Sequence, residues 1–219
     1  MDFRAKIVTW DEIERWCNRI RDQIVGKFRP DIIVGLSRGG LVPARMLSDR
    51  LWIKDLISIK TEHWGITATR SGQAILHDPG KLNLEGRNVL VVDDITDTGQ
   101  SMGLAYDFLK KQSPNELRTA TMLHITRSKF IPDYFSEVVN ENNWAWFIFP
   151  WNVYEDLDNL IGRVMNGPMT FTQIETALRD QFDLNMGSRH LMQVLEDFVV
   201  AGKLSRVKSG YTRISPEPQ

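Results

Sequence analysis

Hydrophobic and polar positions alternate along the chain in blocks that predict helices and strands in turn. Apolar residues at helical spacing predict a helix over about residues 10–25, and a short aliphatic run predicts a strand at 31–35. A second helix is expected at about 42–51, and further strands in DLISIK, VLVV, TATMLHIT and WAWFIFPW. Strands separated by helices are typical of a parallel sheet in an α/β fold, and ligands of such folds bind at the carboxyl ends of the strands.

Three acidic residues directly follow the strand VLVV. Asp93, Asp94 and Asp97 lie within five residues, and two unit charges about 4 Å apart repel by roughly 4 kcal/mol at an effective dielectric near 20. The acids therefore need a cation or hydroxyl donors. Ser101 is expected to cap a helix in SMGLAYDFLKK, and helix amino ends bind phosphate. We expect a phosphate at this turn, with the acids on the polyol or metal beside it.

Composition and charge limit the alternatives. The 219 residues are 42% hydrophobic and 25% charged, which allows either one large domain or one domain plus a small appendage. A net charge of -1 gives no general attraction to nucleic acid or to an anionic membrane. The single cysteine, Cys17, lies on the apolar face of the first helix and is expected in the core. The four histidines lack metal-ligand spacing, so none is assigned to a metal. The amino-terminal residues do not form an apolar segment of the kind that directs export, so a cytoplasmic location is expected.

Three segments resemble one enzyme family. VLVVDDITDTGQSM resembles the signature with which type I phosphoribosyltransferases bind 5-phosphoribosyl 1-pyrophosphate (PRPP). IVGLSRGGLVPARML is similar to the pyrophosphate-binding loop and following helix of the purine salvage branch. WFIFPWN resembles the base-binding segment of archaeal and bacterial xanthine-guanine or hypoxanthine-type enzymes. The three segments follow the family order and span roughly residues 1–157, which implies the parallel-sheet core of this family.

The resemblance implies that the acidic turn binds the phosphoribosyl part of PRPP. Asp93 and Asp94 would bind the ribose hydroxyls, directly or with help from a magnesium ion that spans ribose and pyrophosphate. Asp97 would lie beside the imidazole nitrogen of the purine as general acid or base, so it is the candidate catalytic residue. The 5-phosphate would be held by the turn residues Asp97, Thr98, Gly99, Gln100 and Ser101.

The other two segments would hold pyrophosphate and base. Ser37, Arg38 and Gly39 would face the pyrophosphate, and the Ser37–Arg38 peptide can be cis, as often found at this loop in the family. Trp146 matches the residue that stacks on the purine, and Phe147 follows it, whereas Trp144 and Trp151 are expected in the core or a dimer interface.

The identity of the base stays open between adenine and a 6-oxopurine such as hypoxanthine, guanine or xanthine. The family lysine that reads the 6-oxo group aligns with Arg127, or with Ser128 or Lys129 in a shifted register. Arginine has only hydrogen-bond donors, so it can bind a 6-oxo group but not the amino group of adenine. Adenine would fit only if the arginine side chain turned away and a backbone carbonyl accepted from the amino group. Asn152 stands where close relatives have Glu or Asp.

Two domains are expected. Residues 1–160 would form the phosphoribosyltransferase core, with a lid at about 62–78, and residues 161–219 a small domain of helix, helix and hairpin, the order of a winged helix. Because some bacterial regulators join a phosphoribosyltransferase-like domain to a winged helix, the alternative function is a PRPP-sensing transcription regulator. The small domain carries seven Lys and Arg against six acids, with Glu196 and Asp197 on the candidate recognition helix, so nucleic-acid binding is not expected.

A different class of enzyme shares part of the acidic pattern. DDITD also satisfies the DDxxD pattern of prenyl synthases, but that motif lies on a helix of an all-helical protein, whereas this one follows VLVV. GxxxxGK[ST] and GxGxxG are missing from the sequence, which argues against a kinase or a dehydrogenase. The sequence predicts a purine phosphoribosyltransferase that converts a purine base and PRPP to a nucleoside monophosphate and pyrophosphate. Magnesium would accompany PRPP. The protein is expected to form a homodimer and is not expected to associate with a membrane.

Overall fold

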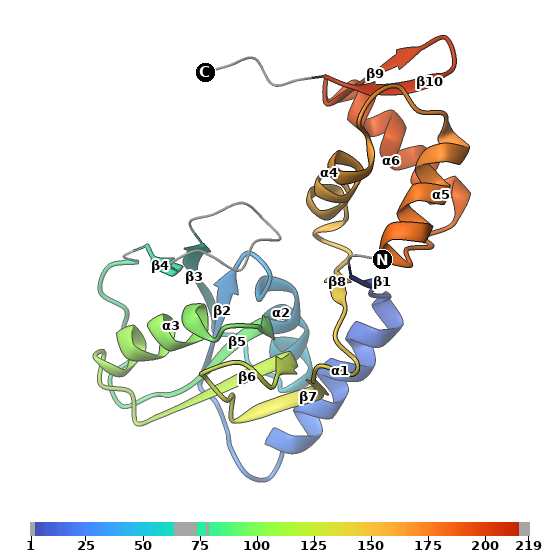
Figure 1. The fold of residues 1–219 in the computed structure, drawn as a ribbon. Coiled ribbons are helices and arrows are strands. Elements are labelled where there is room, and N and C mark those ends of the chain that lie inside the picture. Colours follow the sequence, from blue (N-terminus) through green and yellow to red (C-terminus); the bar gives the residue numbers. More distant parts are fainter. Residues whose placement is uncertain (1–2, 64–73, 78, 215–219) are drawn as a thin grey trace. The chain divides into compact units, whose positions relative to one another are not determined.

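The structure is a computed structural model that describes residues 3–63, 74–77 and 79–214. Contacts between Cα atoms divide the chain into two compact units, and Figure 1 labels the elements of both. The sheet unit comprises residues 10–143, and the terminal unit combines the amino-terminal residues up to Thr9 with the residues from Trp144 onward. The lid expected at about 62–78 lies mostly outside the described residues.

The sheet unit is built on six strands in the order β4-β3-β2-β5-β6-β7. All neighbouring strands are parallel except β4, which is antiparallel to β3. The strands are β2 (Ile32–Ser37), β3 (Leu56–His63), β4 (Ala74–Leu76), β5 (Asn88–Thr96), β6 (Glu116–Ile125) and β7 (Tyr134–Val139). Since β2 and β5 are adjacent and parallel, their carboxyl ends lie at the same edge of the sheet. The expected parallel α/β fold is confirmed.

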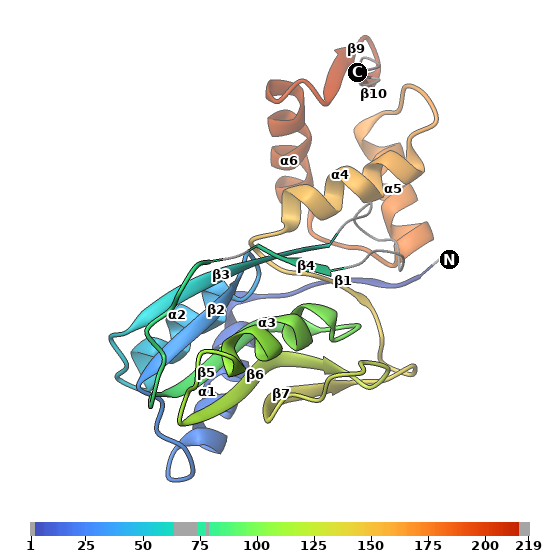
Figure 2. The ribbon, with the colours of Figure 1, turned by 90° about the vertical axis from the view of Figure 1, so that its left-hand side faces the viewer.

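Helices cover both faces of this sheet. Figure 2 shows α3 (Gln100–Lys110) on one face and α1 (Trp10–Ile24) and α2 (Leu41–Arg50) on the other. Cys17 is fully buried on α1, as expected, and burial raises the pKa of its thiol to about 12. The thiol therefore stays protonated at neutral pH and fills the core instead of acting as a nucleophile. The aliphatic residues of β2 and β5 pack on buried Met102, Ala105 and Leu109 of α3.

The start of α3 corrects one expectation. The helix begins at Gln100, and its N-cap residue is Gly99, with φ of 79°, so Ser101 lies inside the first turn and is not the cap. The hydroxyl of Thr98 accepts a hydrogen bond from the backbone N–H of Gln100 at 3.3 Å. A left-handed backbone favours glycine, which is why the chain enters the helix two residues earlier than the hydroxyl pattern indicated.

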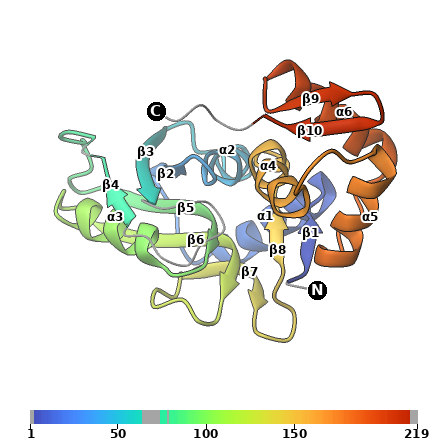
Figure 3. The same cartoon turned by 45° about the horizontal axis from the view of Figure 1, so that its top comes forward.

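The terminal unit contains two short parallel strands, three helices and a hairpin (Figure 3). Strand β1 (Ala5–Ile7) pairs with β8 (Trp146–Ile148), so the strand expected in WAWFIFPW is only three residues long and is not part of the six-stranded sheet. The other elements are α4 (Val153–Val164), α5 (Phe171–Phe182), α6 (Ser188–Val200), β9 (Leu204–Val207) and β10 (Gly210–Arg213). Their buried apolar side chains form one core together with Ala5 and Ile148.

The two helices and the hairpin expected after residue 161 are present, and α4 precedes them. An isolated antiparallel bridge joins Met169 to Tyr211 of β10. The contacts group residues 144–160 with the carboxyl-terminal elements, and the domain boundary near residue 160 stays a prediction. Within the described residues, no helix is both long and apolar enough to cross a membrane.

Candidate active site

The glycine turn after β2 lies directly against the acidic end of β5. A Cβ atom built on Gly39 would lie 2.1 Å from Oδ2 of Asp94, and one on Gly40 would lie 2.4 Å from the carbonyl oxygen of Val92. Neither position has room for a side chain. The parallel pairing of β2 with β5 therefore brings together the two loops that the sequence predicted separately as pyrophosphate and ribose sites.

The backbone of this turn is tightly held. The Ser37–Arg38 peptide bond is cis, as the family resemblance allowed. The N–H of Gly40 donates to the carbonyl of Leu36 at 2.8 Å, and the N–H of Leu41 donates to that of Arg38 at 3.2 Å. Arg38 is exposed while Gly39 and Ser37 are partly buried, so a guanidinium group stands at the rim of a compact turn. Such a turn suits a multiply charged anion.

Asp93 and Asp94 form a strained electrostatic pair at the end of β5. The N–H of Asp94 donates to Oδ1 of Asp93 at 2.9 Å, and Asp94 is buried. Burial, and then the neighbouring Asp94 carboxylate, raise the pKa of Asp93 well above its ordinary value. Carboxylates in this situation gain from hydroxyl donors or from a hard cation. Within the described residues, no group of three or more acidic, histidine or cysteine side chains could hold a metal.

Asp97 is held by Arg127, which follows β6. The Nε of Arg127 donates to Oδ1 of Asp97 at 2.8 Å, and its Nη2 donates to the same oxygen. The side chain of Asp97 is 47% exposed and that of Arg127 is 38% exposed, so ligands can reach this ion pair. The two residues were predicted at the site on separate grounds, and the fold brings them into contact.

The turn predicted to bind the 5-phosphate is closely packed from behind. A Cβ atom on Gly99 would lie 2.6 Å from Oγ of Ser128 and 2.7 Å from the backbone nitrogen of Phe130. The N–H of Lys129 donates to the carbonyl of Thr98 at 3.2 Å. Gln100 begins α3, and its side-chain oxygen accepts a hydrogen bond from the N–H of Ala74 at 3.1 Å. The turn thus combines a left-handed glycine with the amino end of an 11-residue helix.

One buried contact at this site was missed from the sequence. Thr96, the residue before Asp97, makes a hydrogen bond of 3.0 Å between its Oγ1 and Nδ1 of His124 on β6. His124 received no function from the sequence, because the histidines lack metal-ligand spacing. The pair could be found only from the parallel register, which sets Thr96 opposite His124.

The residues predicted to bind the base belong partly to the terminal unit. Trp146 donates from Nε1 to Oδ1 of Asp156 at 3.0 Å, and its ring centroid lies 6.2 Å from that of Phe3. The ring of Trp144 also lies 6.3 Å from Phe3. The ring of Phe147 is approached by Lys6, whose Nζ lies 6.0 Å from the centroid. The roles of Trp146 and Phe147 at a purine stay predictions.

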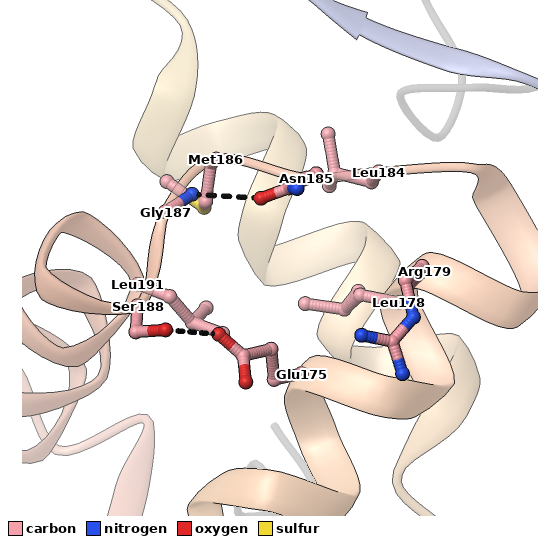
Figure 4. Close-up of a pocket in the computed structure, with 9 residues that line it drawn as sticks. All are labelled: Glu175, Leu178, Arg179, Leu184, Asn185, Met186, Gly187, Ser188 and Leu191. Atoms are coloured by element: carbon pink, nitrogen blue, oxygen red, sulfur yellow. Dashed lines mark hydrogen bonds between the residues drawn. The ribbon is translucent and has the colours of Figure 1, made fainter.

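A small pocket in the terminal unit contains none of the predicted site residues. It has a volume of about 250 Å³ and lies where α5 connects to α6 (Figure 4). Ser188 donates to Oε1 of Glu175 at 2.6 Å, and the N–H of Gly187 donates to Oδ1 of Asn185 at 3.1 Å. Polar groups around this pocket are thus engaged in holding the amino end of α6.

The sequence profile of the phosphoribosyl transferase domain family matches residues 5–156, about two thirds of the chain. The chain belongs to this family. Its fold is that of the type I enzymes, and it is a phosphoribosyltransferase. The site described above is therefore the candidate active site of a phosphoribosyltransferase.

Relatives of this phosphoribosyltransferase are named for purine substrates. The xanthine-guanine phosphoribosyltransferase of Cereibacter sphaeroides is 28% identical over 67% of this chain and 86% of its own length. The enzyme of the same name from Idiomarina loihiensis is 25% identical over 69% of this chain and 89% of its own length. The crystal structure of a purine phosphoribosyltransferase from Pyrococcus horikoshii is 28% identical, covers 69% of this chain and 94% of its own, and has a TM-score of 0.57.

Proposed function

We propose that this phosphoribosyltransferase transfers the phosphoribosyl group of PRPP to a 6-oxopurine, namely hypoxanthine, guanine or xanthine. The products are the nucleoside monophosphate and pyrophosphate. The observation that carries the proposal is the contact between the glycine turn and the acidic strand end, because PRPP carries pyrophosphate and ribose hydroxyls on adjacent atoms. The names of the relatives support the purine class.

Each loop has one task in this reaction. Arg38 and the backbone at Gly39 bind the pyrophosphate, Asp93 and Asp94 accept hydrogen bonds from the ribose hydroxyls, and the start of α3 binds the 5-phosphate. The raised pKa of Asp93 supports this assignment, since donors or positive charge at this position relieve a carboxylate that burial and Asp94 destabilise. Asp93 and Asp94 offer the hard oxygens that suit magnesium, which when bound with PRPP supplies positive charge to the leaving pyrophosphate.

The bond changes are a displacement at the anomeric carbon. An imidazole nitrogen of the purine forms a bond to C1 of the ribose, and the bond from C1 to the pyrophosphate oxygen breaks, with its electron pair leaving on pyrophosphate. The transition state has oxocarbenium character, so the protein mainly orients the reactants and stabilises developing charge. Asp97 takes the proton that the imidazole nitrogen loses.

The choice of a 6-oxopurine rests on Arg127. A guanidinium has five N–H donors and no acceptor, so it can bind a 6-oxo group but not the 6-amino group of adenine. Its contact with Asp97 supports a position beside the imidazole ring, which adjoins the carbon that bears the 6-oxo group. Adenine would place an amino donor against the guanidinium donors, which costs affinity because both remain unsatisfied.

The charges of the terminal unit do not favour the alternative of a nucleic-acid-binding regulator. On α6, Glu196 accepts hydrogen bonds from Arg206 and Tyr211, and Asp197 accepts them from Tyr154 and Gln193. The pairing of Arg206 with Glu196 neutralises a basic residue of the hairpin. Phosphate contacts dominate nucleic-acid affinity, and these acidic and paired side chains do not favour such contacts.

A substrate panel tests the proposal. The full chain is assayed with PRPP, magnesium, and either adenine, hypoxanthine, guanine or xanthine, and the formation of nucleoside monophosphate and pyrophosphate is measured. At least one 6-oxopurine should be turned over, with kcat/KM at least about tenfold above that of adenine. Turnover of adenine above all three 6-oxopurines would refute the role given to Arg127.

A further inference from the structure

The end of β6 holds the acidic turn from two sides. On the buried side, Nδ1 of His124 and Oγ1 of Thr96 are 3.0 Å apart, and these residues are only 6% and 2% exposed. On the open side, Arg127 donates two hydrogen bonds to Oδ1 of Asp97. Thr96 and Asp97 are consecutive, so two contacts from one strand end fix both the backbone and the carboxylate of the candidate catalytic residue.

His124 is itself rigidly placed. Its ring packs on Phe135 of β7, with centroids 5.1 Å apart. Burial lowers the pKa of His124, so the imidazole is neutral at neutral pH and offers one donor and one acceptor. The hydroxyl of Thr96 can accept from or donate to it, and breaking the contact would leave a polar group buried without that partner.

The turn that carries Arg127 is anchored by backbone hydrogen bonds. The N–H of Thr126 donates to the carbonyl of Val139 at 2.8 Å, and the N–H of Ser128 donates to that of Ile125 at 2.9 Å. Arg127 therefore reaches Asp97 from a fixed position beside the paired strands β6 and β7. The contact from His124 therefore originates from a strand, and the contact from Arg127 originates from the hydrogen-bonded turn that follows this strand.

We infer that His124 and Thr96 are positioning residues for Asp97. They do not touch substrate in this assignment; they hold the backbone from which the Asp97 carboxylate reaches the purine, while Arg127 holds the carboxylate itself. The inference rests on the proposed function, because it takes Asp97 as the proton acceptor. A displacement of about 1 Å at a reacting group can lower a rate by about 100-fold, so a buried contact next to Asp97 can govern turnover without binding anything.

Substitutions of buried threonines in the same sheet test this role. Thr96→Val removes the hydroxyl and keeps the shape, and kcat should fall about 10- to 100-fold while KM for PRPP changes less than about threefold. Thr96→Ser keeps the hydroxyl and should restore most of kcat. The double variant Thr96→Val with His124→Leu should lower kcat no further than the more impaired of the two single variants, because both substitutions remove one and the same hydrogen bond.

Two threonines of the neighbouring strand β6 are matched controls. Thr119 is fully buried and bonds the Asp133 carboxylate at 2.8 Å, so Thr119→Val should lower stability but leave kcat within about twofold of wild type. The hydroxyl of Thr121 is buried and has no hydrogen-bond partner among the described residues, so Thr121→Val should lower neither stability nor kcat. If Thr96→Val changes kcat no more than Thr119→Val does, or raises only KM for PRPP, the positioning role is wrong.

Hydrogen exchange separates this inference from the proposed function. In the full chain, Thr96→Val should speed amide exchange at residues 96–98 by at least about tenfold, and Thr119→Val should not. If wild type turned over no purine, the proposed function would fail, yet the exchange result would still report whether His124 and Thr96 hold the turn. Unchanged exchange at residues 96–98 in Thr96→Val would overturn the inference whatever the activity.

Discussion

A Cβ atom at Gly39 would lie 2.1 Å from Oδ2 of Asp94, so the turn proposed to bind pyrophosphate and the strand end proposed to bind ribose are packed together without room for a methyl group. Two parts of one ligand can be bound at once only if their sites are this close. This contact, which joins residues 55 positions apart in the chain, is the geometric basis for assigning PRPP to the site.

Gly39→Ala tests the contact directly. The added methyl group must displace the Asp94 carboxylate, so we expect PRPP affinity to fall by at least about tenfold, or about 1.4 kcal/mol. Titration calorimetry with PRPP and magnesium measures it. Gly103→Ala, inside helix α3, is the control, because among the described residues a Cβ atom there would meet only Phe130, at 3.8 Å. That variant should bind PRPP normally and unfold at equal or higher denaturant concentration.

Asp93→Asn should stabilise the unliganded protein at neutral pH and weaken PRPP binding. The folded-state pKa of Asp93 is raised, so the folded protein binds more protons than the unfolded chain above the ordinary pKa near 3.8. The contribution of Asp93 to stability therefore declines as pH rises from that value through the raised one. Urea unfolding at pH 5 and pH 8 measures it, and the gain from Asp93→Asn should be larger at pH 8.

The exposed Asp107 provides the control for charge. Asp107→Asn makes the same chemical change on α3, away from Asp94, and should leave the pH dependence of stability close to that of wild type. An equal effect of the two substitutions would mean that net charge, and not burial beside Asp94, accounts for the result.

Asp97→Asn should lower kcat far more than PRPP affinity. Asparagine keeps the size of the side chain but cannot accept the imidazole proton, and general-base groups typically contribute about 100- to 10,000-fold to rate. The ion pair with Arg127 is solvent-exposed, so its loss should change stability by less than about 1 kcal/mol. Steady-state kinetics measure kcat of this variant, and titration with PRPP measures its affinity for PRPP. Normal turnover with lost PRPP binding would assign Asp97 to the phosphate instead of the base.

Trp146→Ala should weaken purine binding by about 1 to 3 kcal/mol while PRPP binding alone is retained, if the indole stacks on the base. Because Trp146 also bonds Asp156 and packs on the core of the terminal unit, the same variant should lose stability. Trp144→Ala is the control, since that ring likewise contacts Phe3. Purine titration monitored by fluorescence separates the two variants, and equal losses of purine affinity would leave the stacking residue unidentified.

Local patterns in the sequence were sufficient for the main architecture. The spacing of apolar residues predicted α1 and α2 to within a few residues, and the aliphatic runs marked β2, β5 and β6. The glycine and acidic motifs identified loops that the parallel pairing of β2 with β5 then brings together. These features depend on residues near one another in the chain, which is why they could be read from it.

Features that depend on distant pairing could not be predicted in this way. The bond between Thr96 and His124 follows from the register of β5 against β6, and the pairing of β8 with β1 joins segments about 140 residues apart. The start of α3 was misplaced because the hydroxyl of Ser101 and the glycine at 99 both suit the N-cap position of a helix. The N-cap residue is Gly99, whose backbone is left-handed.

The reaction proposed for this site is transfer of the phosphoribosyl group from PRPP to a 6-oxopurine, at the contact between the two loops. A single-turnover reaction of wild-type protein in excess over PRPP, with magnesium and hypoxanthine, guanine or xanthine, tests it most directly by mass analysis of the quenched mixture. At least one base should give nucleoside monophosphate and pyrophosphate in equal amounts, and Asp97→Asn should form them at least about 100 times more slowly. PRPP that is bound but recovered unchanged with every base would contradict the account.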